Sequence, residues 1–181
     1  MKTCKIFLTI AIAILFFSTA MAKESGKKAG GFGGVSFQNT NFMGEWAMEV
    51  GGIGAGYLLD GFYVGGGGFG MSQSKNDLDY SMGYGGLMLG YNLFSEKTKT
   101  SLNFNLLGGY GGISVEGGDT PDEADGFWVV KPNAEVEFRI TSFMRIGVGG
   151  GYRLVMGADL PRVDNNDVSA PYGSITFRFG G

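Results

Sequence analysis

Hydrophobic and polar residues alternate along most of this sequence, most clearly from Met144 to Leu154. There the even-numbered positions hold Met, Ile, Val, Gly, Tyr and Leu, whereas the odd-numbered positions hold Arg145, three glycines and Arg153. Successive side chains of a β-strand point to opposite faces, so this spacing gives one apolar and one charged face. A helix would mix the two sets, because its side chains share a face at spacings of three and four. The pattern therefore predicts a strand.

The same pattern recurs eight times along the chain and predicts an all-β fold. The predicted strands cover residues 33–40, 45–58, 62–72, 79–93, 100–115, 127–140, 144–155 and 169–179. The connections at 59–61, 94–99 and 141–142 are short, whereas those at 73–78, 116–126 and 156–167 are longer and acidic. The first connection, 41–44, breaks this trend because it is short although it falls at the end of the longer loops. Short turns at one end and longer loops at the other are typical of transmembrane β-barrels. We predict an eight-stranded antiparallel up-and-down transmembrane β-barrel over residues 33–181.

The polar faces of the predicted strands are built mainly from small residues, while most charge lies in the loops. This distribution suits a narrow barrel interior and places the apolar faces against lipid. The charged side chains predicted to point inward are Glu49, Lys131, Glu135, Glu137, Arg139, Arg145, Arg153 and Arg178. Charges in a low-dielectric interior must be paired. We therefore expect a salt-bridged plug that holds the barrel closed, with a gated narrow conduit as the alternative.

Two further expectations follow from this face assignment. The short turn at Thr141–Ser142 brings Arg139 close to Arg145, and we expect Glu137 to lie between these like charges. We also expect Gly149→Ser, on the inner face, to be milder than Val148→Arg, which places a charge on the lipid face.

Aromatic residues gather beside the short turns and the C-terminal end: Phe62, Tyr63, Tyr91, Phe94, Phe143, Phe177 and Phe179. They predict an aromatic girdle at one membrane interface. The alternative is that aromatic residues simply favour strands.

The N-terminal residues 1–22 predict a secretory signal peptide. Lys2 and Lys5 precede an apolar run from Ile6 to Phe17, and small residues at Ala20 and Ala22 form a cleavage site. This run is too short for a membrane-spanning helix, which needs about 20 apolar residues. Residues 23–32 are predicted to be a flexible N-terminal segment.

Composition excludes several function classes. Without Lys2 and Lys5, the chain has 12 basic and 17 acidic residues, so its net charge is negative. A chain of this charge is a poor candidate for binding nucleic acid. It has no histidine, and Cys4 is its single cysteine, which argues against a Ser-His-acid triad and against zinc or redox sites. The glycines of "GGIGAGYLLDG" lead into another predicted strand and lack the helix that a dinucleotide site requires. We expect no catalytic residues and no cofactor.

The acidic loops supply oxygen ligands that suit Ca²⁺ or Mg²⁺. These residues are Asp119, Asp122, Glu123 and Asp125 in one loop, and Asp164 and Asp167 in another. They could bridge divalent ions to anionic lipopolysaccharide. The alternative is that both loops are simply solvated.

The chain resembles the small eight-stranded outer-membrane barrels of Gram-negative bacteria, the OmpA- and OmpW-like class. The segments "GGVSFQ", "VGGGGFG", "GYGGLMLGY", "RIGVGGGYR" and "ITFRFG" are similar to a group of exported glycine-rich barrels. Phe177 and Phe179 resemble the C-terminal signal by which the barrel-assembly machinery recognises its substrates, although Gly180 and Gly181 follow them here.

This resemblance implies a location in the outer membrane, in contact with its lipid and lipopolysaccharide. It implies a role in envelope integrity or in presenting surface loops to partners. Two alternatives stay open: a narrow transport module for small apolar molecules, and a soluble periplasmic barrel that binds lipid inside, with the two faces inverted.

Overall fold

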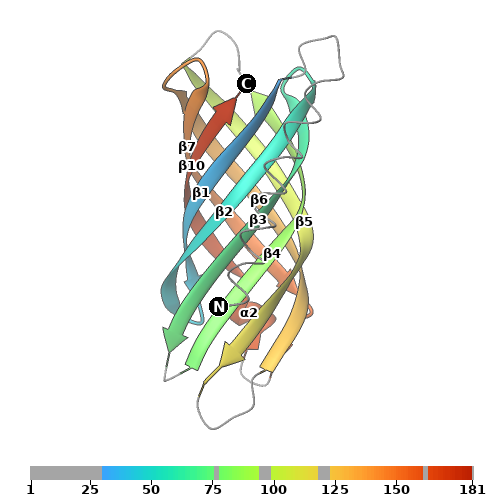
Figure 1. The fold of residues 1–181 in the computed structure, drawn as a ribbon, viewed down its shortest axis with the longest axis vertical. Helices are drawn as coiled ribbons and strands as arrows, with labels where there is room; N and C mark the ends of the chain where they lie inside the picture. The colour runs from blue at the N-terminus through green and yellow to red at the C-terminus, as the bar shows by residue number, and fades with distance from the viewer. Residues whose placement is uncertain (1–29, 76–77, 94–98, 118–122, 161–162, 181) are drawn as a thin grey trace, which may run out of the picture.

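The computed structural model describes residues 30–75, 78–93, 99–117, 123–160 and 163–180. The predicted signal peptide and most of the segment 23–32 lie outside these ranges. Within them, eight strands close into one barrel (Figure 1). Its strands are β1 (Gly31–Phe42), β2 (Glu45–Leu59), β3 (Phe62–Lys75), β4 (Leu78–Leu93), β5 (Thr100–Glu116), β6 (Glu123–Arg139), β7 (Met144–Met156) and β10 (Ala170–Gly180).

Each strand pairs antiparallel with its neighbours in the chain, and β10 pairs back onto β1 to close the sheet. At the closure Phe37 lies opposite Ile175, and Gly34 lies opposite Arg178. A closed barrel has no free edge, so its backbone polar groups are paired between strands. The predicted eight-stranded antiparallel barrel is confirmed.

Several strands extend further than the alternation predicts. β1 begins at Gly31 because Phe32 packs inside the barrel, with its ring centroid 5.0 Å from that of Tyr63. β3 runs to Lys75 and β4 starts at Leu78, so most of the loop predicted at 73–78 is strand. The added pairs join Gln73 to Tyr80, Ser74 to Asp79 and Lys75 to Leu78, so the β3 side of this extension is polar and gives no apolar alternation.

The connection from β7 to β10 contains structure that the alternation does not predict. Two short strands, β8 (Asp159–Leu160) and β9 (Val163–Asp164), form a small hairpin, and helix α2 (Asn165–Val168) follows. Asp164 caps α2, since its carboxylate accepts from the backbone N–H groups of Asn166 and Asp167. No helix in the described ranges is long and apolar enough to cross a membrane.

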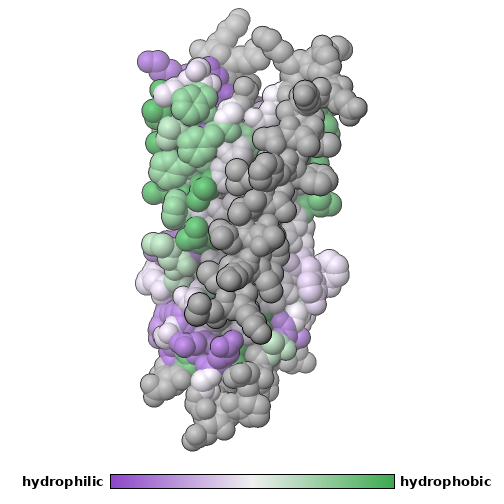
Figure 2. Space-filling view, viewed as in Figure 1, coloured by the Kyte–Doolittle hydropathy of each residue, from purple (hydrophilic) through white to green (hydrophobic). Residues whose placement is uncertain are grey.

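The outer surface of the barrel carries the apolar faces of the strands. Val148, Tyr152 and Leu154 of β7 are exposed, whereas Arg153 is fully buried inside. Apolar side chains gather on the visible wall over its short-turn half, and hydrophilic ones lie nearer the loop end (Figure 2). Tyr63 departs from the predicted aromatic girdle, because it is fully buried in the barrel interior.

The barrel interior is not polar throughout. Toward the long loops it is filled by an apolar core: Phe42, Ala47, Phe69, Met71, Leu78, Tyr80, Met82, Tyr84, Leu107, Ile113, Val115, Phe127, Val129, Val155, Ala158 and Val168. β4 shows the change within one strand. Its inward Tyr80 and Met82 lie near the loops, whereas Leu87 and Leu89 near the turns point outward. The expectation of a uniformly polar interior is therefore wrong for the loop half.

The inward-facing glycines leave no space for a side chain. A Cβ at Gly149 would lie 2.0 Å from the carbonyl oxygen of Ala134 and 2.8 Å from Cγ of Glu135. The outward-facing Gly173, on the neighbouring strand, has its nearest atom at 4.0 Å from such a Cβ. Gly149→Ser is expected to be milder than Val148→Arg only if the small lumen has space for the added side chain. This geometry does not meet that condition, because contacts of that length force the backbone to move.

We expect Gly149→Ala to lower the free energy of unfolding by about 1–3 kcal/mol, the usual cost of overpacking. Gly173→Ala should change it by less than about 0.5 kcal/mol, as is usual for surface substitutions. Urea unfolding of the two variants, refolded into lipid vesicles, measures both values. Equal effects of the two substitutions would show that interior space does not limit the inward positions.

Candidate functional site

The most concentrated chemistry of the barrel lies in two groups of buried charges. The first, here called the short-turn cluster, consists of Glu135 and Glu137 of β6, Arg145 of β7 and Arg178 of β10. Glu135 and Glu137 are two residues apart, so the strand points both carboxylates into the barrel. Antiparallel pairing of β6, β7 and β10 then brings the arginines to the same end.

Arg178 is the centre of the short-turn cluster. Its Nη2 atom lies 2.9 Å from Oε2 of Glu135, and its Nη1 atom donates to Glu137. Nη2 also donates to Oδ1 of Asn103 at 3.1 Å, while the guanidinium lies 4.9 Å from the ring centroid of Phe32. One buried arginine therefore bridges two buried carboxylates, and Arg145, whose Nη1 atom lies 3.6 Å from Oε2 of Glu137, supplies the second positive charge. Such pairing offsets the high cost of removing charges from water.

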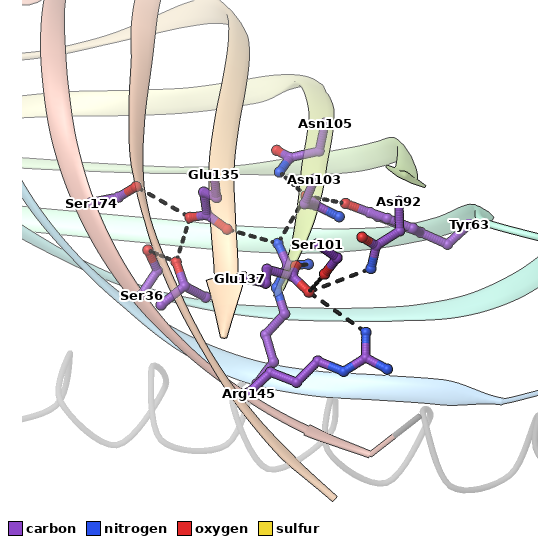
Figure 3. A network of polar contacts seen from close by, with 12 residues as sticks. Ser36, Tyr63, Asn92, Ser101, Asn103, Asn105, Glu135, Glu137, Arg145 and Ser174 are labelled. Atoms are coloured by element: carbon purple, nitrogen blue, oxygen red, sulfur yellow. Dashed lines mark hydrogen bonds and ion pairs between the residues drawn. The ribbon is translucent and has the colours of Figure 1, made fainter. Parts of the chain in front are cut away.

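Hydroxyl and amide groups complete the shell around the two carboxylates (Figure 3). Ser174 and Thr176 donate to Oε1 of Glu135 at 3.1 and 2.7 Å. Asn92 donates to Oε2 of Glu137 at 3.4 Å, and Ser101 is 3.5 Å from the same atom. Hydrogen bonds of this kind stabilise the ionised form of a buried carboxylate.

Three arginines lie in one row across the short-turn end. Arg139 is paired in register with Arg145, which is paired with Arg178. Glu137 is hydrogen-bonded to Arg178, and its Oε2 atom lies 3.6 Å from Nη1 of Arg145. The expected contact between Glu137 and Arg145 is thus present. The main partner of Glu137, however, is an arginine that sequence reasoning did not pair with it.

The second group, here called the central cluster, consists of Glu49 of β2, Lys131 of β6 and Arg153 of β7. Oε2 of Glu49 lies 3.0 Å from Nη1 of Arg153 and 3.5 Å from Nζ of Lys131. All three side chains are at most 2% exposed. A single carboxylate therefore serves two buried cations.

Lys131 gains its remaining stabilisation from neutral groups. Its Nζ atom donates to Gln38 and to Tyr84 at 2.5 Å each. The same atom lies 3.7 Å from the ring centroid of Phe69 and 4.5 Å from that of Tyr172. Aromatic faces attract a cation most strongly where water is excluded. The rings thus compensate for the missing second carboxylate.

Arg153 joins the central cluster to helix α2. Its Nε atom donates to the backbone oxygen of Val168 at 2.8 Å, and the Val168 side chain is fully buried in the apolar core. Met43 holds the same helix from the first hairpin, since its backbone N–H donates to Asp167 at 3.0 Å. The helix is therefore fixed to the barrel wall at the loop end.

A small cavity lies between the two clusters. It has a volume of about 20 Å³, and its lining includes Gln38, Lys131, Asn133, Glu135 and Arg178. A cavity of this size holds about one water molecule. Among the described residues, these contacts fill the barrel interior around the cavity. The arrangement can hold a barrel shut.

The loop carboxylates predicted to contact divalent ions are used in other ways where they are described. Asp164 and Asp167 form a reciprocal capping box on α2. Asp125 accepts from the backbone N–H of Gly126 at 2.7 Å. Asp119, Asp122 and the side chain of Glu123 lie outside the described part of the chain. Within that part, no group of three or more His, Cys, Asp or Glu side chains is placed to hold a metal ion.

The two residues of the predicted assembly signal lie on the outer face of β10. Phe179 is 43% exposed, and the ring of Phe177 contacts Phe37 edge-on at 6.2 Å across the closing strand pair. Gly180 ends β10 with a φ of +105°, a conformation that favours glycine.

Comparison with solved structures identifies the fold. The structure of Neisserial surface protein A (NspA) has a TM-score of 0.63 to this chain, with 12% identity over 83% of this chain and 95% of that one. Ail, the attachment invasion locus protein of Yersinia pestis, has a TM-score of 0.52, with 13% identity over 84% and 97%. No family model and no curated protein matches the sequence. The chain therefore has the fold of the small outer-membrane β-barrels.

We expect Glu137→Gln to destabilise the barrel by about 3–5 kcal/mol, because it removes one of the two carboxylates that pair with buried Arg178 and the carboxylate that lies beside Arg145. Combining it with Arg178→Gln should cost about 1–3 kcal/mol less than the two single changes summed. Urea unfolding in lipid vesicles measures this coupling. The coupling with Arg145→Gln should be smaller, since the Arg145 side chain is 17% exposed.

The matched control is the exposed pair of Lys75 and Glu45, whose charged atoms are 3.2 Å apart. Its coupling should not exceed about 1 kcal/mol. Additive effects of Glu137→Gln and Arg178→Gln would refute the pairing.

Proposed function

We propose that this protein is an integral outer-membrane barrel that does not conduct, and that it supports the envelope and presents its loop end to surface partners. The observation that carries the proposal is the filled interior. The short-turn cluster closes one half of the barrel, and the apolar core with helix α2 fills the other. Eight-stranded barrels have interiors just wide enough for side chains to fill, and the contacts of Arg178 and Lys131 agree with this.

The outer face supports a membrane location. Large apolar side chains are exposed all around the barrel, including Trp46 at 76%, Leu87 at 74% and Phe104 at 46%. A water-soluble protein rarely exposes so extended an apolar surface. This distribution favours the membrane barrel over a soluble periplasmic lipid carrier, which would carry its apolar faces inside and a polar surface outside.

The loop end supports a role in surface contacts. Helix α2 is fixed by Arg153 and by its own capping box, so it presents a defined surface at the loop end. One similar protein is named a surface protein, and the other is named for attachment and invasion and is also known in complex with the heparin analogue sucrose octasulfate. By analogy, we propose that partners of this chain are bound outside the barrel and not within it.

Fractionation tests the location. The expressed protein should partition with the outer membrane after detergent extraction. It should also migrate faster on a gel when unheated than when boiled, because a closed barrel resists detergent unfolding. Recovery in the periplasmic supernatant without heat-modifiable migration would contradict the membrane location.

Bilayer conductance tests the closed interior. The purified protein, refolded and checked by its heat-modifiable migration, should produce no steady conductance steps across a planar bilayer, because its lumen is packed with side chains. Steady channels of nanosiemens size would show that the interior contains a water-filled path, as a conduit requires.

A further inference from the structure

The two charge clusters of the barrel interior differ in their balance of charge. The short-turn cluster sets two carboxylates against two guanidinium groups. In the central cluster, Glu49 lies beside both Lys131 and Arg153, and all three side chains are at most 2% exposed. A charge buried without a counter-charge is costly in a low-dielectric interior. With its three groups ionised, the central cluster therefore carries one positive charge in excess.

The surroundings of Lys131 suit a charged ammonium group. Its Nζ atom donates to the amide oxygen of Gln38 and to the hydroxyl of Tyr84, and it lies over the rings of Phe69 and Tyr172. An ammonium group has three donors and no acceptor, and aromatic faces attract cations. These four neighbours are all uncharged. They therefore stabilise the ammonium group without removing the excess charge.

The small cavity between the clusters adjoins this excess charge. Lys131 and Arg178 both line it, together with the hydroxyl-bearing Ser36 and Thr176. Arg178 is 3% exposed, and its Nε atom is buried without a hydrogen-bond partner among the described residues. Two cations thus border one cavity, and one of them has an N–H donor to spare. This combination favours an occupant that accepts hydrogen bonds and carries negative charge.

Glu135 also lines the cavity, but both of its carboxylate oxygens are engaged. Ser174 and Thr176 donate to Oε1, and Arg178 donates to Oε2. A positively charged occupant would face the two cations of the lining. A water molecule could bond to Oδ1 of Asn133, a buried acceptor of the lining that has no partner within the described ranges. Water would, however, leave the charge of the central cluster unbalanced.

We infer that this cavity is a binding site for one monatomic monovalent anion, such as chloride. Its volume of about 20 Å³ suits a single particle of about the size of water and excludes sulfate, phosphate and organic anions. One such anion would make the central cluster neutral. The site goes beyond the proposed closed-barrel function, because it makes the stability of the barrel depend on the halide concentration.

A halide titration tests the inference. The protein is refolded into phosphatidylcholine vesicles in gluconate buffers, in which chloride or bromide replaces gluconate at constant ionic strength. Urea unfolding then gives the unfolding constant at each halide concentration. For a single site, the unfolding constant should fall by about elevenfold when the halide concentration is about ten times the dissociation constant.

Two variants remove the need for an anion. Gln38→Glu places a carboxylate oxygen at the position of the amide oxygen that accepts from Lys131, and Lys131→Met removes the excess cation. Both variants should lose the halide dependence. In gluconate, Gln38→Glu should also unfold at a higher urea concentration than the unsubstituted protein. The matched control is Lys75→Met, which removes a partly exposed lysine beside Glu45 and should keep the full halide dependence.

Crystals grown in bromide give an independent measurement, since bromide should produce an anomalous-scattering peak between Lys131 and Arg178. If the halide dependence of the unsubstituted protein is no greater than that of Gln38→Glu, the inference is overturned in favour of water or of an uncharged lysine. A bromide peak without halide-dependent unfolding would mark an adventitious ion only and would also overturn it. Heat-modifiable migration of every sample shows whether the barrel has folded.

Discussion

The narrowness of the barrel interior is the constraint on which the rest of this structure depends. With eight strands, the inward side chains touch across the lumen, and little space is left for water. Every inward charge must then be neutralised by other side chains. Arg178 between Glu135 and Glu137 is the clearest result, because one guanidinium bonds to both carboxylates and to Asn103.

The abundance of glycine follows from the same constraint. Gly147 leaves room for Glu135, since a Cβ there would lie 2.9 Å from the carboxylate oxygen. Gly151 leaves room for the Tyr172 hydroxyl, which reaches the carbonyl oxygen of Pro132 at 3.3 Å. The pairing of β6 with β7 is interrupted at Lys131 and Pro132, and the Pro132 carbonyl accepts from this side-chain donor. The inward-facing glycines between Arg145 and Arg153 therefore leave the space that Glu135 and Tyr172 occupy from the neighbouring strands.

The fold and the identity of the inward charges were predictable from the sequence because both depend on period two alone. The alternation of apolar and polar residues predicts that Glu49, Lys131 and Arg153 face inward, and all three are buried inside the barrel. Their partners were less predictable, because contacts across the lumen join strands that are distant in sequence. Glu137 and Arg178 illustrate this, since only the closure of β10 beside β1 and β7 brings them together. The apolar core was not predicted, because the apolar face changes side within a strand. In β4 the outward positions are apolar near the short turns and the inward positions are apolar near the loops. A single apolar face assigned to the whole strand does not detect this change.

The central cluster is less well balanced than the short-turn cluster. Its single carboxylate serves two cations, whereas Glu135 and Glu137 face Arg178 and Arg145. Both clusters leave buried polar atoms without a hydrogen-bond partner among the described residues: Oε1 of Glu49 and Nη2 of Arg153 here, and Nε of Arg178 and Nδ2 of Asn103 in the short-turn cluster. Replacing buried ion pairs by apolar residues is often neutral or stabilising, so a cluster of this kind is weak evidence of a contribution to stability. Its distinctive contact is the bond from Arg153 to Val168, which links the barrel wall to α2. An apolar side chain could fill the same space without orienting that helix. The cluster is therefore best understood as the contact that fixes helix α2 at the loop end of the barrel.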